Sequence, residues 1–290
     1  LASNLRLPLP LPPVPSRVHQ RRVFEETYYT NVCTWSYTMA FWSWREWERH
    51  IDWMALHGVT MALVLSGREY VMYRLLSSYG VDDAAILHFF TGPAFLAWHR
   101  MGNLKGWGGG LTVEWLEKQR ELTEKILRRM RAVGIKAILP AFSGHVPEAL
   151  RDTAKGKDAK IDHGPGWFGF KHTYSQVPYI DPSEKLYYNI SVDFLNLQSE
   201  IFGSDWVYAM DQFNEINPKE NTEAFVASAS SAFSRVLQAH HSDAIWVMQG
   251  WLFVHARDFW TERLIQAYLA PVKRSQLIVL DLISESSPTY

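Results

Sequence analysis

The stretch WVYAMDQFNEINP, residues 206–218, decides how the rest of this chain is interpreted. Its first half is aromatic and aliphatic with hardly a charge, which is typical of a strand buried on both faces of a sheet. Its second half ends in Glu215, followed by Pro218. A carboxylate at the end of a buried strand is costly unless something compensates for the water it loses. A second apolar run, LIVLDLISES at 277–286, finishes in Glu285 in the same way.

Outside these two stretches, short apolar runs alternate with longer segments of helical period. This alternation predicts βαβ units and a parallel sheet, and hence the α/β class. The predicted strands are 29–35, 59–65, 135–142, 206–213, 244–250 and 277–282. The clearest helix lies between the second and third of them, because Thr112 can cap its start, an apolar stripe follows, and Gly134 comes directly after its end.

Two segments lose both periods and predict loops. Residues 151–180 are rich in glycine, lysine and polar residues, and they follow the strand at 135–142 on the side where active-site loops gather in parallel sheets. Residues 102–111 contain five glycines and predict a second surface loop. The start of the chain, residues 1–27, is rich in proline and predicts an extended linker, and we expect that upstream sequence is missing.

Composition excludes several classes of partner. The 290 residues include 29 basic and 30 acidic ones, a balance that argues against a nucleic-acid-binding surface. No apolar run reaches the roughly eighteen residues that a membrane span needs, so no membrane partner is expected. Cys33 is the single cysteine, which excludes an internal disulfide and a cysteine-based zinc site.

The two glutamates have a functional interpretation and a structural one. The ends of parallel strands meet at one edge of a sheet, so Glu215 and Glu285 are expected on the same side, and paired carboxylates are what glycoside hydrolysis requires. The alternative is an ordinary strand-end acid held by hydrogen bonds. Asp211 and Asp281 each lie four residues before these glutamates. They are either a second pair or residues satisfied inside the sheet, and their depth favours the structural role.

Neighbouring polar and aromatic residues fit a sugar site. Asn214 precedes Glu215 and can bond a sugar substituent, although it is equally at home in a turn. Aromatic faces pack well on pyranose rings, and tryptophans recur near strand ends, although most tryptophans in proteins are core residues. The chain has 13 of them, and those near strand ends or loops are Trp35, Trp98, Trp107, Trp167 and Trp251.

Other chemistries find little support. His145 and Glu148 follow the strand at 135–142, but they supply only two ligands where a catalytic zinc ion needs three. No phosphate-binding glycine loop and no nucleophile-elbow motif is present in the sequence. We therefore predict neither a metal nor another cofactor. Asn189-Ile-Ser191 is a glycosylation sequon, which suits a protein of the secretory route.

Six motifs in order resemble those of one family of glycoside hydrolases, the α-N-acetylglucosaminidases. The motifs are YYTNVCTWSYTMAFWSWREWERHIDWMALHGV, FFTGPAFLAWHRMGNL, LPAFSGHVPEA, FNEINP, QGWLF and LDLISES. The resemblance runs from about Tyr28 to Tyr290 apart from a variable loop at about 151–205. It implies a (β/α)8 barrel of the TIM type, a retaining mechanism and a lysosomal, vacuolar or secreted location. The implied substrate is a heparan-type glycan with terminal α-linked N-acetylglucosamine.

The resemblance also assigns roles to residues. It implies that Glu215 is the acid/base and that Glu285 is the nucleophile. It implies substrate contacts for Asn31, Cys33, Trp98, Trp167 and Trp251, and Asn214 joins them by its position. In an α-linked N-acetylglucosaminide the 2-acetamido group is cis to the leaving oxygen and cannot attack from the rear. An enzyme carboxylate must then do so, which predicts Glu215 and Glu285 carboxyl groups about 5 Å apart.

The extent of the chain departs from the family pattern. Six strands are countable where a closed barrel has eight. We therefore expect residues 28–290 to be a partial barrel, truncated after about six βα units. The resemblance implies that the family's C-terminal helical domain is absent, that the linker at 1–27 follows a missing N-terminal domain, and that any oligomer forms through missing domains. A weakly stable, poorly active fragment is the expected result. The competing interpretations are a glycan-binding module and an inactive truncated product.

Overall fold

The computed structural model describes most of the chain. The described residues are 10, 13, 16, 17, 19–21, 23–281, 284 and 286–288. The predicted nucleophile Glu285 lies outside the described residues, and so does much of the predicted linker. The predictions about these residues therefore stay predictions.

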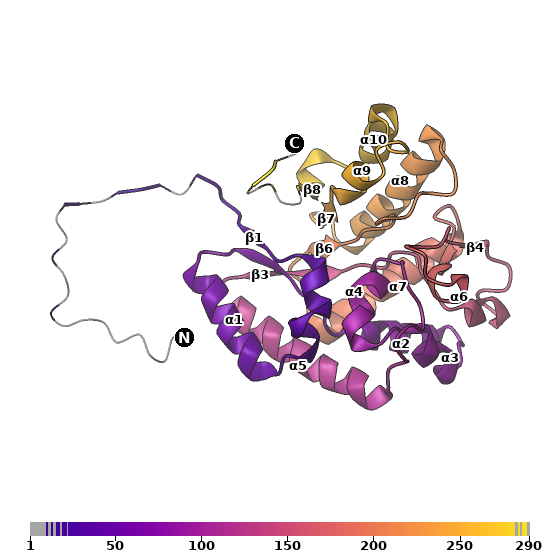
Figure 1. Ribbon diagram of the computed structural model, residues 1–290, viewed down its shortest axis with the longest axis horizontal. Helices are drawn as coiled ribbons and strands as arrows, with labels where there is room; N and C mark the ends of the chain where they lie inside the picture. The colour runs from indigo at the N-terminus through magenta and orange to yellow at the C-terminus, as the bar shows by residue number, and fades with distance from the viewer. Residues whose placement is uncertain are drawn as a thin grey trace.

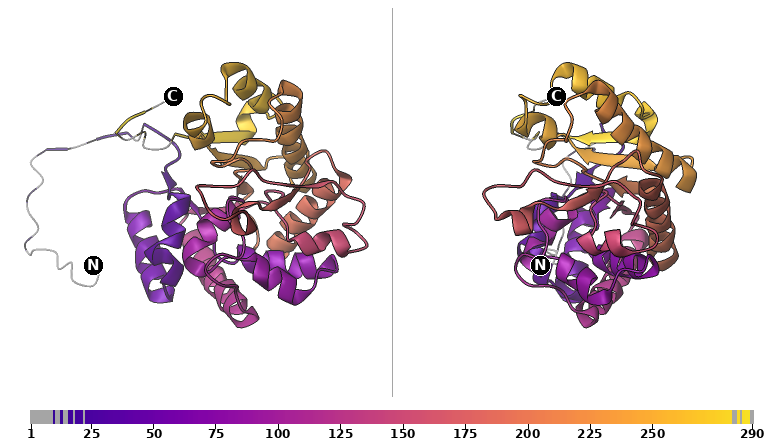
Figure 2. Two further views of the ribbon diagram at one scale, coloured as in Figure 1. Left: turned by 45° about the vertical axis from the view of Figure 1, so that its right-hand side comes forward. Right: turned by 90° about the vertical axis from the view of Figure 1, so that its right-hand side faces the viewer.

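Six strands form one parallel sheet that curls into an open half-barrel (Figures 1 and 2). In spatial order they are β1 (Tyr28–Tyr29), β2 (Met61–Leu63), β3 (Lys136–Pro140), β6 (Val207–Ala209), β7 (Ile245–Gln249) and β8 (Leu277–Leu280). Every adjacent pair is parallel, with Ala62 opposite Ala137 and Tyr208 opposite Trp246. All six carboxyl ends therefore face one rim, and the predicted α/β class and barrel type are confirmed.

Helices run between the strands and cover the outside of the sheet (Figure 1). The crossover helices are α1 (Trp44–Leu56), α5 (Val113–Ala132), α7 (Lys185–Phe202), α8 (Glu223–His240) and α10 (Glu262–Leu269). The other α-helices lie in the segments that follow the strands, namely α2 (Arg68–Ser78), α3 (Asp83–Phe89), α4 (Leu96–Arg100), α6 (His172–Ser175) and α9 (Trp251–His255). One crossover helix thus separates each pair of successive sheet strands, as in a βα barrel.

The ends of α5 show why the local prediction was right. The Thr112 hydroxyl accepts a hydrogen bond from the Trp115 N–H at 3.2 Å and satisfies a free donor of the first turn. Gly134 follows the helix with φ +79°, a left-handed conformation that a side chain would disfavour. The apolar stripe of the helix packs inward, with Ile126 and Met130 buried.

The strands are shorter than predicted, and the first prediction was partly wrong. Residues 31–35 do not continue β1 but enter a 3-10 helix, η2 (Val32–Ser36). The Asn31 side chain caps this helix by accepting the Cys33 N–H at 2.8 Å, which offers the backbone an alternative to the sheet. The remaining 3-10 helices are η3 (Thr38–Phe41), η4 (Pro93–Phe95), η5 (Glu148–Asp152) and η6 (Arg274–Gln276).

The segment expected to be one variable loop at 151–205 contains regular structure. Strands β4 (Ile161–His163) and β5 (Pro178–Ile180) pair antiparallel and form a small second sheet. Helix α7 then occupies Lys185–Phe202 and is a crossover helix of the barrel, so the loop interpretation was wrong for that part. Residues 164–177 between the two short strands are mostly irregular, apart from α6, and we call them the β4–β5 excursion.

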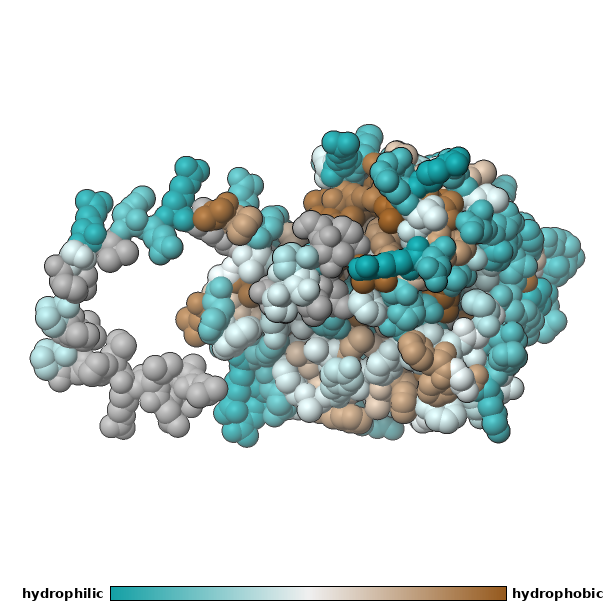
Figure 3. All heavy atoms as spheres, turned by 45° about the horizontal axis from the view of Figure 1, so that its top comes forward, coloured by the Kyte–Doolittle hydropathy of each residue, from teal (hydrophilic) through white to brown (hydrophobic). Residues whose placement is uncertain are grey.

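The core fills the space between the sheet and its helices. Strand β2 is buried throughout, and Ile138, Trp246 and Phe194 are fully buried. Strand β8 is partly exposed, and Val279 on it is 36% exposed. Figure 3 shows that hydrophobic residues reach the surface in the middle of one face, whereas hydrophilic residues cover its right-hand edge. None of the helices in the described part of the chain has the length and apolar character that a bilayer crossing needs.

Candidate active site

The predicted site residues that the structure describes follow the carboxyl ends of sheet strands, so one rim brings them together. Asn31 and Cys33 follow β1, and Trp98 lies on α4 in the segment after β2. Trp167 lies on the excursion in the segment after β3. The remaining three residues, Asn214, Glu215 and Trp251, follow β6 and β7.

Glu215 is the centre of this rim. The Trp167 indole donates its Nε1–H to Glu215 Oε2 at 3.0 Å, and the Trp251 indole donates to Oε1 at 2.9 Å. The two tryptophans come from segments 84 residues apart, so their convergence is a property of the fold and not of local sequence. Both donors are neutral. The carboxyl group is therefore oriented at both oxygens without being paired to a cation.

The backbone presents Glu215 in an unusual conformation. Its φ is 53°, in the left-handed region that residues with a Cβ seldom adopt. The peptide between Asn214 and Glu215 is held by a side chain, because Asn103 donates from Nδ2 to the Asn214 carbonyl at 2.7 Å. Asn103 is fully buried and Asn214 is buried beside it. These contacts fix the turn that aims Glu215 at the two indoles.

Aromatic rings extend the site on one side. Trp98 and Trp167 have ring centroids 6.3 Å apart with planes inclined by 35°. Trp167 also stacks on Phe170, with centroids 5.5 Å apart and planes at 16°. The Trp98 and Trp167 side chains are partly exposed, so their faces are available to an apolar surface of a ligand.

Cys33 completes the group. Its thiol is partly buried, and burial first, then the nearby Glu215 charge, raises the pKa of this thiol above its usual value. The sulfur is therefore neutral under ordinary conditions, which suits a contact residue and not a nucleophile. The side-chain oxygen of Asn31 accepts the Cys33 N–H, as described above, so the side-chain nitrogen of Asn31 remains available to donate to other partners.

Three comparisons with known proteins agree on the family. The tim-barrel domain of alpha-N-acetylglucosaminidase matches residues 27–290 of this chain. The chain belongs to the α-N-acetylglucosaminidase family. The human alpha-N-acetylglucosaminidase is 42% identical over 288 residues, which are 99% of this chain and 38% of the human protein.

Solved structures give the same result. The family 89 glycoside hydrolase of Clostridium perfringens in complex with 2-acetamido-1,2-dideoxynojirmycin has a TM-score of 0.86 and 32% identity. The match covers 98% of this chain and 31% of that one. A variant of a Clostridium perfringens family 89 enzyme with two glutamates changed to glutamine, in complex with its substrate GlcNAc-alpha-1,4-galactose, has a TM-score of 0.86 and 30% identity, with the same coverage. The chain thus spans about a third of the length of these relatives.

Within this α-N-acetylglucosaminidase barrel, Asp211 lies between the end of β6 and Glu215. Its Oδ1 accepts the Gln249 N–H at 2.8 Å, which ties the end of β6 to β7. Burial raises the pKa of this carboxyl to about 6, and the hydrogen bond opposes the shift only in part. Tyr28 faces the same region, and burial followed by the Asp211 charge raises the pKa of its hydroxyl. A carboxyl bonded to the backbone of the next strand agrees with the structural role that its depth predicted.

The two residues of the possible metal motif, His145 and Glu148, have different partners in the structure. His145 is buried, its Nδ1 lies 2.9 Å from the Ser143 hydroxyl, and burial lowers its pKa to about 3. Glu148 instead contacts Arg151 and His163 at 2.6 and 2.9 Å. Among the described residues, no group of three or more histidine, cysteine, aspartate or glutamate side chains is placed to hold a metal ion.

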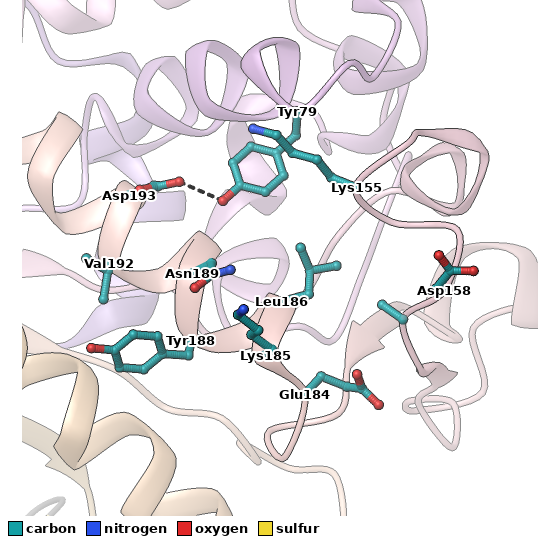
Figure 4. Close-up of a pocket in the computed structure, with 11 residues that line it drawn as sticks. Tyr79, Lys155, Asp158, Glu184, Lys185, Leu186, Tyr188, Asn189, Val192 and Asp193 are labelled. Atoms are coloured by element: carbon teal, nitrogen blue, oxygen red, sulfur yellow. Dashed lines mark hydrogen bonds between the residues drawn. The ribbon is translucent and has the colours of Figure 1, made fainter.

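A hollow on another part of the surface lies away from this rim. It has a volume of about 580 Å³ and is lined by Tyr79 of the segment after α2, by Lys155 and by residues of α7 (Figure 4). The Tyr79 hydroxyl donates to Asp193 at 2.6 Å there. The sequon residue Asn189 is exposed in this hollow. None of its lining residues belongs to the predicted site, so size does not identify the reactive pocket.

Sequence reasoning missed two supports of the site. Asn103 sits in the glycine-rich loop at 102–111, where nothing in the sequence distinguishes it from a turn residue. Arg100 on α4 binds Glu69 on α2 through two hydrogen bonds of 2.8 Å, and both residues are buried. An ion pair between residues 31 positions apart leaves no local pattern that could have revealed it.

Proposed function

We propose that this chain supplies the acid/base half of an α-N-acetylglucosaminidase active site, with Glu215 as the group that transfers the proton. The observation that carries the proposal is the Glu215 carboxylate at the end of β6, held at both oxygens by the indoles of Trp167 and Trp251. Membership of the family supports it, and so does the position of the site at the rim where TIM barrels perform their chemistry.

The neutral partners suit a residue that alternates between two charge states. In the first half of a retaining reaction the acid/base protonates the departing glycosidic oxygen, and in the second half it takes a proton from the incoming water. A guanidinium partner would oppose the protonated form strongly. Indole N–H groups can orient both forms, because a protonated carboxyl still has lone pairs to accept their hydrogen bonds.

The remaining residues are proposed to bind the terminal sugar. Trp98, Trp167 and Trp251 would pack against the pyranose ring, while Asn31, Cys33 and Asn214 would contact its substituents. The substrate class is a glycan with terminal α-linked N-acetylglucosamine, and we propose heparan-type chains as its natural source. We propose a lysosomal, vacuolar or secreted location for the whole protein. An assembly of several copies would form through parts outside this chain.

The proposed nucleophile is a second carboxylate. Double displacement needs a nucleophile on the face opposite Glu215, and Glu285 is the residue that the sequence predicts for it. In the Clostridium perfringens variant bound to its substrate, the two exchanged glutamates lie farther apart along that chain than Glu215 and Glu285 do here. Trapping a glycosyl-enzyme with a fluorinated N-acetylglucosaminyl donor and mapping the labelled peptide tests Glu285. A label on another carboxylate would remove it from the mechanism.

The role of Glu215 is tested by chemical rescue. Glu215→Ala in the full protein should lose turnover of an unactivated α-N-acetylglucosaminide yet still be glycosylated by a donor with a good leaving group. Azide, which needs no general base, should then restore the second step and release the α-configured glycosyl azide. A β-configured azide would identify residue 215 as the nucleophile, and the absence of any azide product would contradict the acid/base role. Binding of the sugar by the wild type without any turnover would favour the glycan-binding alternative.

A further inference from the structure

The indole that holds Glu215 from one side sits on a segment that also contacts the 102–111 loop. The Lys105 N–H donates to the Tyr174 carbonyl at 2.8 Å, and the Trp107 ring contacts Phe170 and Tyr174. Trp167 lies on the β4–β5 excursion, which stands away from the main sheet, whereas Glu215 lies on the loop between β6 and α8. A cavity of about 250 Å³ separates the two segments. Its walls include Gly164, Pro165 and Tyr179 from one side and Phe213, Ile216 and Pro218 from the other. The cavity therefore interrupts direct packing between these two segments.

One lysine bridges the two segments at their base. Lys219 follows the Glu215 turn, and its Nζ lies 2.7 Å from Asp162 Oδ2 and 2.5 Å from Asp181 Oδ2. Asp162 belongs to β4 and Asp181 comes directly after β5, so Lys219 holds both ends of the excursion at once. Among the residues that the structure describes, three hydrogen bonds join residues 160–181 to residues 211–220. Lys219 makes two of them, and the third is the Trp167–Glu215 bond itself.

The bridge is sheltered from water at Asp181, whereas Lys219 and Asp162 stay partly accessible. The Asp181 side chain is 6% exposed and that of Lys219 is 22% exposed. Burial opposes the charged form of Asp181, but hydrogen bonds from Lys219 and Ser183 prevail and hold the pKa of this carboxyl below its usual range. Asp181 Oδ1 accepts from the Ser183 N–H at 3.0 Å and from its hydroxyl at 2.7 Å, so the acceptor is fixed before the lysine reaches it.

We propose that Lys219 is a positioning residue for the reaction: by tying both ends of the β4–β5 excursion to the Glu215 loop, it sets where the Trp167 indole meets the Glu215 carboxylate. The inference rests on the proposed function, because it concerns the same acid/base. Lys219 itself contacts neither oxygen of Glu215. Its effect passes through Trp167, and small displacements of a group that orients a reacting residue reduce rates strongly.

Lys160 provides a matched control. Its Nζ lies 3.3 Å from Asp181 Oδ2, so it faces the same carboxylate as Lys219 does. Lys160 and Asp181 flank the same small sheet, and removing this lysine breaks no link to the Glu215 loop. Lys160→Met and Lys219→Met thus make the same change of charge beside the same acid, and only the second cuts the bridge.

The kinetic test compares these variants in the full protein with an aryl α-N-acetylglucosaminide. Lys219→Met should lower kcat about tenfold, Lys219→Arg should restore most of it, and Lys160→Met should stay within about twofold of the wild type. A double-mutant cycle with Trp167→Phe is decisive, because Lys219→Met should have little further effect once the Trp167 N–H is gone. Additive losses in the double variant would overturn the proposal.

A second measurement does not depend on turnover, and it separates failure of this inference from failure of the proposed function. Amide hydrogen exchange of residues 164–177 should accelerate about fivefold or more in Lys219→Met and remain at the wild-type rate in Lys160→Met. Equal exchange in the two variants would overturn the bridge whether or not the protein is active. If Lys219→Met does not fold, Asp162→Asn removes one of the two bonds, and the same acceleration is expected in a smaller degree.

Discussion

Two buried or half-buried carboxylates in this chain differ in what holds them. Glu69, beneath the rim on α2, is fully buried and bound at both oxygens by the Arg100 guanidinium, with donor distances of 2.8 Å. Burial alone would raise the pKa of Glu69, but the charge and hydrogen bonds of Arg100 outweigh it and hold this pKa below its usual range. Glu215 also has a donor at each oxygen, but both donors are neutral indoles.

The difference separates a structural acid from a reactive one. A carboxylate locked to a guanidinium stays ionised, because its protonation would leave a buried cation without its partner. A carboxylate held by neutral N–H groups keeps its orientation in either charge state. Each carboxylate has a donor at both oxygens, so the charge of the partner is what supports our proposal that Glu69 serves stability and Glu215 chemistry.

Neutralising the proposed acid/base should have the largest effect on activity. Glu215→Gln should lower kcat/KM by about 10²–10⁴-fold, the range usual for loss of a general acid/base. The free energy of unfolding should change by less than about 1 kcal/mol, because the side chain is partly exposed. Hydrolysis of an aryl α-N-acetylglucosaminide and urea unfolding measure the two quantities. A variant that keeps more than a tenth of the activity would contradict the assignment.

The same Glu→Gln substitution at Glu69 should mainly lower the free energy of unfolding. Glu69→Gln leaves Arg100 buried without its counter-charge, beside the buried Arg68, and should reduce the free energy of unfolding by about 3–5 kcal/mol. Glu121→Gln is the control, because Glu121 meets Arg120 only at 3.6 Å on the surface and should cost no more than about 0.5 kcal/mol. Equal stability of the two variants in urea would mean that the Glu69 pair is not structural.

Removing one of the two indole donors tests whether that donor orients the Glu215 carboxyl group. Trp251→Phe keeps most of the ring but deletes the N–H to Glu215 Oε1 and should lower kcat/KM about tenfold, as expected for one hydrogen bond to a charged group. Trp53→Phe, at an exposed ring on α1, should leave the rate unchanged. Steady-state kinetics of the two variants give the test, and an unchanged rate in Trp251→Phe would show that its N–H does not orient the acid.

Asp211 is an intermediate case, because a backbone N–H holds it and, among the described residues, no lysine or arginine forms an ion pair with it. Its pKa of about 6 lies above its ordinary value of 3.8, so the folded protein binds this proton more tightly than the unfolded chain does. The contribution of Asp211 to stability is therefore present below about pH 4 and declines as the pH rises toward 6. Asp211→Asn should remove this decline and stabilise the protein by roughly 1–2 kcal/mol at pH 7. Melting temperatures between pH 4 and 7 that run parallel in the two proteins would contradict it.

The sequence predicted the parts of the fold that depend on local chemistry. The helix after Thr112 has its cap, its stripe and its terminal glycine within one segment, and the structure has all three. The apolar runs predicted the strands of the sheet, and their parallel order placed Glu215 and the tryptophans at one rim. Strand lengths were overestimated, because Asn31 turns the chain out of β1 through a side-chain hydrogen bond that competes with the ladder.

The rest depends on contacts between distant segments. The two indoles reach Glu215 from residues 48 and 36 positions away, and Asn103 supports Asn214 from 111 positions away. Such distances carry no periodic signal, so resemblance to a family could name Trp167 and Trp251 but not their bonds. The helix inside 151–205 was missed for a different reason, since the polar, glycine-rich residues before it drew attention away from the apolar spacing of α7.

The backbone at Glu215 has a consequence for how such a chain varies. A left-handed φ of 53° costs a residue with a Cβ about 1–2 kcal/mol, a penalty that glycine escapes. A library of variants sorted only for resistance to heat should therefore enrich Gly at this position, whereas one sorted for turnover should reject it. Glutamate at this position therefore carries a backbone penalty, which our proposal explains by the need for its side chain in the reaction.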